Sequence, residues 1–81
     1  QNYPNPFNPE TNISYELKQK AFVTLKVFDL SGKEVAVLVN GIKASGSYNV
    51  KFSGADLSSG LYFYKLESGE FSEVKKMMLI K

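Results

Sequence analysis

The sequence predicts an all-β fold, an antiparallel β-sandwich of six to seven strands of the immunoglobulin-like or fibronectin III-like kind. Apolar and polar residues alternate in one segment after another, and turn-forming residues recur roughly every ten residues. No segment shows the hydrophobic period of an amphipathic helix. A chain of 81 residues is the size of one domain, so we expect a single domain over residues 1–81.

The segment 61–66 is the centre of the predicted sandwich because it is apolar on both faces. Such a strand is typical of the middle of a sheet, where both sides are covered. The opposite face then carries Leu61 and Phe63, which need cover of their own. Gly60 supplies a turn geometry closed to other residues, and Tyr62 behind it predicts a tyrosine corner, a phenol bonded to upstream backbone. The side chains expected in the core are Tyr62, Tyr64 and Leu66.

Residues 1–11 are rich in proline and asparagine, a composition of turns and extended segments. Either a flexible linker or an ordered arm would have this composition. We expect an ordered arm, because Tyr3 and Phe7 are costly to leave in water and can pack onto the sandwich. The chain begins at Gln1 without a methionine, which is expected of a piece of a longer polypeptide.

The other predicted strands alternate apolar and polar side chains, and they cover residues 12–17, 21–30, 33–39, 47–52 and 71–81. Turns are expected at 31–32, where Gly32 supplies a positive φ and Asp29 accepts bonds from the turn's amides, and at Asn40-Gly41.

The last strand should pair with segment 61–66 through the turn at 68–69. Its apolar residues run together, so its inward face is the least determined by pattern. We expect Val74, Met78 and Ile80 to face inward.

The composition argues against several classes of function. The chain has no Cys and no His, which removes thiolate metal sites and the commonest general base, and we expect neither catalysis nor a cofactor. A net charge of +2 without arginine gives no reason to expect nucleic acid, and no apolar run is long enough to insert in a membrane. Four residues could supply oxygen ligands to a calcium ion, but Asx-turns explain their presence better. They are Asn5, Asn8, Asp29 and Asp56.

Two binding functions stay open from the residues alone. Five Tyr and six Phe could form a carbohydrate-binding platform, or serve a purely structural appendage. The alternative is a basic cluster on the final strand, Lys75, Lys76 and Lys81, which offers a partner charge and a free backbone edge.

Four motifs, in order along the whole chain, resemble the C-terminal sorting domains of the type IX secretion system (type A, Por secretion tail). They are residues 2–9 (Asn-Tyr-Pro-Asn-Pro-Phe-Asn-Pro), 27–35, 56–66 and 75–81. The immunoglobulin-like domains of flagellar hook-capping proteins share part of these motifs. The chain departs from the pattern at Phe52-Ser53, where relatives often carry Trp-Asp.

The resemblance implies a signal that directs a cargo protein, fused on its N-terminal side, through the outer membrane of a Bacteroidota-like bacterium. The cargo would pass through the periplasm and end as a secreted or cell-surface protein. The implied partners are the translocon and its attachment machinery, met by a monomer that does not insert in the membrane. The resemblance places the recognition element at the C-terminal strand, and the residues expected to carry it are Lys75, Lys76, Lys81, Met78 and Ile80.

Overall fold

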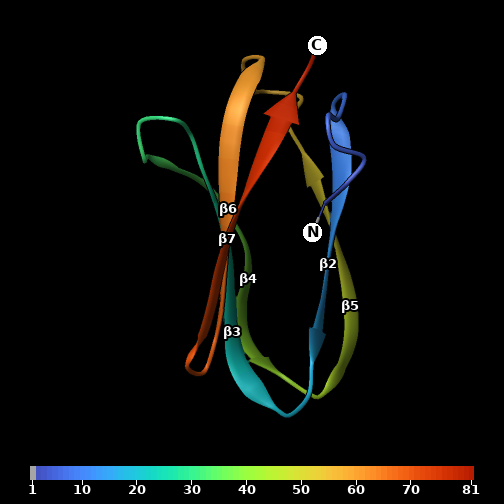
Figure 1. Cartoon of the computed structure of the whole chain (residues 1–81), viewed down its shortest axis with the longest axis vertical. Helices are drawn as coiled ribbons and strands as arrows, with labels where there is room; N and C mark the ends of the chain where they lie inside the picture. Colours follow the sequence, from blue (N-terminus) through green and yellow to red (C-terminus); the bar gives the residue numbers. More distant parts are fainter. Residues whose placement is uncertain (1) are drawn as a thin grey trace.

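Residues 2–81 are described by a computed structural model, in which two antiparallel sheets face each other (Figure 1). One sheet has the strand order β1-β2-β5 and the other the order β4-β3-β6-β7. No helix is present in this described part of the chain, and the predicted β-sandwich is confirmed. The strands are β1 (Asn2–Tyr3), β2 (Glu10–Leu17), β3 (Ala21–Phe28), β4 (Glu34–Lys43), β5 (Gly46–Ser53), β6 (Gly60–Ser68) and β7 (Phe71–Leu79).

The core lies between the sheets and is built from alternate side chains of each strand. This follows from the strand period of two, which sends every second side chain to the same face. The predicted inward residues of β6 are buried, as are those of β2 and β3. These buried side chains are Tyr62, Tyr64, Leu66, Ile13, Tyr15, Leu17, Val23, Leu25 and Val27.

Strand β6 is an interior strand, between β3 and β7, as its apolar character predicts. Its turn to β7 is short, since β6 ends at Ser68 and β7 begins at Phe71. The outward residues Leu61 and Phe63 are half-buried. The predicted pairing of the last two strands is therefore confirmed.

The predicted turn at Asn40-Gly41 is wrong. Strand β4 continues through it, with Asn40 opposite Thr24 and Gly41 opposite Val23 of β3. Pairing with β3 satisfies the backbone groups of this segment, and that tertiary context overrides a local turn preference. The chain instead leaves the sheet after Lys43 and crosses to β5.

Phe7 of the arm packs into the core and is 1% exposed, but the prediction that Tyr3 packs onto the sandwich is wrong, because that side chain is 81% exposed. Tyr3 lies in β1 opposite Asn12 of β2, and the neighbours of Asn12, Thr11 and Ile13, are the buried ones. Directly opposed residues share a face, so the pairing sends the Tyr3 ring to the outer side of the sheet. Gln1, the first residue of the predicted arm, lies outside the described residues.

The predicted inward face of β7 is also wrong. Met77 and Leu79 are buried, whereas Val74, Met78 and Ile80 are 59%, 39% and 49% exposed. The register explains the difference, because Met77 lies opposite the core residue Tyr62. A strand shifted by one residue exchanges its two faces, and four successive apolar residues do not specify which register is used.

Candidate functional site

A tyrosine corner sets the start of β6. Gly60 has φ +149°, a conformation that a residue with a side chain rarely adopts. Two residues later the Tyr62 hydroxyl donates a hydrogen bond to the Ser58 carbonyl oxygen at 2.7 Å. The bond joins the start of β6 to the turn that precedes it, so β6 begins in a defined orientation.

The C-terminal residues are tied to the loop that precedes this corner. The Lys81 backbone N–H donates to Oγ of Ser59 at 3.0 Å, and the Lys81 ammonium donates to the Ala55 carbonyl oxygen at 2.6 Å. Lys81 is thus held against the domain and contributes two anchoring bonds. Ile80, directly before it, is kept in line with β7.

The N-terminal arm bonds to the outer edge of β7. The Phe7 N–H donates to the Met78 carbonyl, and the Ile80 N–H donates to the Phe7 carbonyl, both at 2.9 Å. The side-chain amide of Asn5 extends the pairing: its Oδ1 accepts from the Met78 N–H at 3.0 Å, and its Nδ2 donates to the Lys76 carbonyl at 3.4 Å. The arm therefore acts as a short parallel strand beside the C-terminal half of β7.

Packing beneath the arm is close. The Phe7 ring meets the Phe52 ring edge-to-face, with 6.0 Å between centroids. Gly54 donates its N–H to the Pro9 carbonyl at 2.8 Å, and a Cβ on Gly54 would lie 2.8 Å from Cδ2 of Leu79. Only glycine lets these segments approach so closely. The arm and the C-terminus are thus parts of one packed unit.

The outward side of the β6–β7 hairpin carries a surface that we call the outer hairpin face. Cross-strand register brings its members together, with Leu61 opposite Met78 and Phe63 opposite Lys76. Val74, Met78 and Ile80 are exposed, whereas Leu61 and Phe63 are half-buried. The face comprises Leu61, Phe63, Val74, Lys76, Met78 and Ile80. It joins Lys76 to a strip of apolar side chains, a combination that suits recognition of another chain. Lys65 lies opposite Val74 on the same side of the hairpin and is paired with Glu67.

The structure does not bring the three predicted lysines into one cluster. Lys75 and Lys76 are consecutive in β7, so their side chains leave opposite faces of the sheet. Lys75 pairs with Glu73 at 3.6 Å, and Lys81 is bonded to Ala55. Lys76 makes no ion pair within residues 2–81 and shares the outer hairpin face with Met78 and Ile80.

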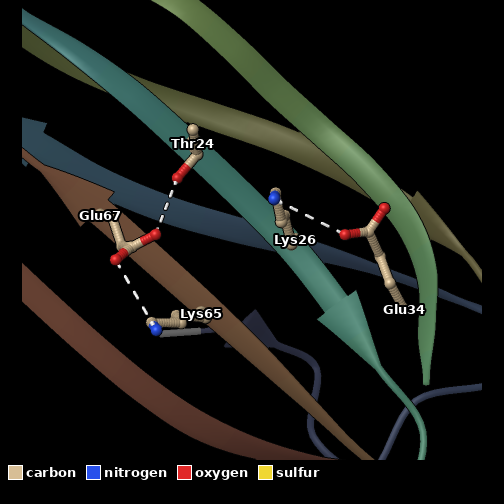
Figure 2. Close-up of polar contacts among 5 residues, drawn as sticks. All are labelled: Thr24, Lys26, Glu34, Lys65 and Glu67. Atoms are coloured by element: carbon tan, nitrogen blue, oxygen red, sulfur yellow. Dashed lines mark hydrogen bonds and ion pairs between the residues drawn. The ribbon is translucent and has the colours of Figure 1, made fainter. Parts of the chain in front are cut away.

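The middle of the same sheet is electrically neutralised by its own residues (Figure 2). The Lys65 ammonium lies 3.6 Å from Oε2 of Glu67, whose other oxygen is 3.4 Å from the Thr24 hydroxyl. Lys26 pairs with Glu34 at 3.6 Å. Lys76, at the sheet edge, therefore differs from the lysines on the neighbouring strands.

The Asp29 turn has a structural role, as the sequence predicts. Its Oδ1 accepts from the Ser31 N–H at 2.9 Å, the Ser31 hydroxyl at 2.7 Å and the Lys33 N–H at 3.0 Å. The Ser31 hydroxyl, followed by the Lys33 amide, lowers the pKa of Asp29. Gly32 closes the turn with φ +89°.

Two buried phenols are chemically quiet. The Tyr15 and Tyr64 hydroxyls have no hydrogen-bond partner in the described chain. Desolvation, with the nearby charge of Glu73, raises the pKa of Tyr64 to about 12, and desolvation beside Tyr48 raises that of Tyr15. Both therefore stay neutral at physiological pH and supply no acid–base group there.

Other kinds of site find little support. Over residues 2–81 no group of three acidic side chains could hold a metal ion, and no segment forms a helix able to cross a membrane. The largely exposed aromatic side chains are Tyr3, Phe22 and Phe71. Tyr3 is on the β1-β2-β5 sheet, and Phe22 and Phe71 leave opposite faces of the other sheet, because Phe71 is in register with Val23, the residue after Phe22. They therefore do not form the continuous platform that a carbohydrate-binding module presents.

Sequence reasoning missed both the pairing of the arm with β7 and the exposure of the outer hairpin face. No local pattern signals the first, because the bonds of Asn5 to β7 join residues more than 70 positions apart. A signal for the exposure of the outer hairpin face was present in β6, because the alternation of Tyr62, Tyr64 and Leu66 defines its inward face. Residues of β7 opposite these three share that face, so an assumed register could have assigned the faces of β7.

Comparison with known families gives one match along the whole length. The family described as secretion system C-terminal sorting domain matches residues 1–81. No curated protein matches the chain significantly.

Proposed function

The chain belongs to the family of type IX secretion system C-terminal sorting domains, and we propose that it is the element by which a cargo protein is selected for export across the outer membrane. Membership implies a secreted or cell-surface protein with a cargo part on the N-terminal side. The family is a sorting family rather than a catalytic one. The cargo would reach the periplasm first, and the folded domain would then be bound by the translocon.

The observation that carries the proposal is the contrast between the two faces of β7. Burial accounts for Met77 and Leu79, but the core does not need Met78 or Ile80, which are 39% and 49% exposed. Exposed apolar side chains that lie together are typical of surfaces that bind another protein. The export machinery would therefore bind the outer hairpin face.

The recognition residues predicted from the sequence take different parts in this proposal. Lys76, Met78 and Ile80 would contact the machinery directly, since their side chains are on the exposed face. Lys75 leaves the opposite face and Lys81 holds the terminus against the loop at Ala55. Both would support the surface rather than form it.

Export of a reporter fused to residues 1–81 tests the function. We expect the reporter to reach the cell surface or medium with the domain and to accumulate in the periplasm without it. Lys76→Gln should reduce export, whereas Lys75→Gln, its neighbour on the other face, should leave export close to normal. Both changes lie on solvated side chains and should alter the free energy of unfolding by no more than about 0.5 kcal/mol.

Equal export with and without the domain would refute the sorting function. Equal export of the Lys76→Gln variant, verified to be folded, would leave the function and remove Lys76 from the recognised surface.

A further inference from the structure

The outer edge of β7 has a second half that the arm does not cover. We infer that this half, residues 72–76, is a strand-addition site for an extended partner segment that carries an apolar and an acidic side chain two residues apart, on one face. The inference rests on the proposed function, because it names the kind of segment by which the export machinery would hold the domain.

The backbone geometry follows from the bonds of the arm. Met78 directs both its N–H and its carbonyl away from β6, toward Asn5 and Phe7. In a strand these directions repeat every second residue, so Ser72 and Val74 direct their N–H and carbonyl groups to the same side. Strand β7 is at the end of its sheet, and no other strand within residues 2–81 pairs with that side.

The arm shows that this edge accepts a strand. Phe7 makes two ladder hydrogen bonds of 2.9 Å with the C-terminal half of β7. The side-chain amide of Asn5 extends this pairing to the carbonyl of Lys76, as a peptide group of a longer strand would. A partner strand beside residues 72–76 would pair with the same edge of β7, on the N-terminal side of the part that the arm covers. Asn5 sets the upper limit of the free segment.

Side chains along the free half define the chemistry of the partner. Val74 is 59% exposed, and Lys76 makes no ion pair with any described residue, although the lysines in the middle of the sheet do. An apolar residue beside Val74 and a carboxylate beside Lys76 would lie on the same face of the added strand, two residues apart.

Lysines on a strand edge commonly deter indiscriminate pairing. An edge with an unpaired ammonium repels basic strands and costs an uncharged strand the desolvation of that charge, but it attracts an acidic one. The unpaired Lys76 at the edge would therefore select among extended segments.

The inference can be tested on the intact chain by NMR, with a capped peptide of the repeat Val-Thr-Glu-Thr as the probe, because this repeat places valine and glutamate two residues apart on one face. We expect the peptide to shift the amide signals of Ser72, Val74 and Lys76, and added salt to weaken the binding. The same peptide with lysine in place of glutamate should bind far more weakly. No shift at millimolar concentration, or equal shifts with both peptides, would overturn the inference. So would shifts produced only by raising the protein concentration, since these assign the edge to a second copy.

A proline substitution separates the edge from the fold. Val74→Pro removes an N–H that points away from β6, and proline is tolerated where an edge N–H faces outward. The matched control, Val74→Thr, keeps the donor and the strand preference. Both variants lose the apolar side chain of Val74, so their difference isolates the backbone donor. We expect Val74→Pro to bind the peptide about tenfold more weakly than Val74→Thr, which corresponds to the loss of one hydrogen bond.

The same two variants fused to the export reporter distinguish this inference from the proposed function. Lower export for Val74→Pro than for Val74→Thr supports the strand-addition site. If deletion of the whole domain blocks export but folded Val74→Pro is exported normally, the site is wrong and the sorting function stands. If deletion has no effect, the proposed function itself is wrong.

Discussion

Two pairs of residues on β7 have similar chemistry and opposite surroundings. Met77 and Leu79 lie in the core at 0% and 1% exposure, while Met78 and Ile80 lie on the outer hairpin face at 39% and 49%. The fold accounts for the first pair, because β6 places Tyr62 opposite Met77. It does not require the second pair to be apolar. The difference separates what holds the domain together from what it can present to a partner.

The arm offers the same contrast and the largest expected effect. Phe7→Ala should lower the free energy of unfolding by about 3–5 kcal/mol, because it empties a packed site beside Phe52 and Leu79. Tyr3→Ala, on the exposed ring of the same arm, should change it by no more than about 0.5 kcal/mol. Urea unfolding followed by circular dichroism measures both. Similar losses for the two variants would contradict the assignment of inward and outward rings.

The contrast within β7 can be broken directly. Leu79→Ala should cost about 2–5 kcal/mol, since Leu79 is 1% exposed and packs on Gly54. Ile80→Ala should cost well under half as much, because its side chain is already in contact with water. The pair is to be compared by denaturant midpoints under identical conditions. A larger loss for Ile80→Ala would reverse the assigned faces.

A smaller effect should distinguish two tyrosines of β6. Tyr62→Phe removes the bond to the Ser58 carbonyl and should cost about 1 kcal/mol. Tyr64→Phe removes a buried hydroxyl that has no described partner, so it should be neutral or stabilising. Thermal unfolding of the two variants checks the sign. A loss for Tyr64→Phe equal to that for Tyr62→Phe would indicate that the Tyr64 hydroxyl is bonded.

The same phenol should make stability depend on alkaline pH. The pKa of Tyr64 is raised to about 12 in the folded chain, above its ordinary value of about 10. As pH rises between these values the unfolded chain releases this proton and the folded chain keeps it, so stability falls. Below the ordinary value the contribution is fully present. Urea unfolding across this window should show a smaller decline in Tyr64→Phe, and an unchanged decline would argue against the raised pKa.

The sequence predicted the fold well where alternation was unambiguous. Strands β2, β3 and β6 have clean inward sets, and the Asp29 turn and the tyrosine corner could be assigned from short-range chemistry alone. Failures occurred where local pattern and tertiary pairing disagree. Asn40-Gly41 is a turn signal in isolation, but its pairing with β3 keeps it extended.

The candidate site was predicted only in part, for a related reason. The sequence predicts Lys76, Met78 and Ile80 as recognition residues, and this stays a prediction. Met78 and Ile80 were also expected in the core, because a run of apolar residues does not define its own register. The grouping of three lysines was misleading, since neighbours in a strand point to opposite faces. The bonds that tie Asn5 and Phe7 to β7 join residues more than 70 positions apart, and no local pattern reports such contacts.

The most direct test of the account is export of a reporter whose domain carries Met78→Ser and Ile80→Ser together. The two side chains are exposed and make no core contact, so the domain should stay folded, as urea unfolding can verify. The account predicts that the folded variant is retained in the periplasm. A control change of two residues on the outer face of the other sheet, the half-buried Asn12→Ser with the exposed Asn49→Ser, should be exported normally. Normal export of the folded Met78→Ser, Ile80→Ser variant would contradict the claim that the outer hairpin face is recognised.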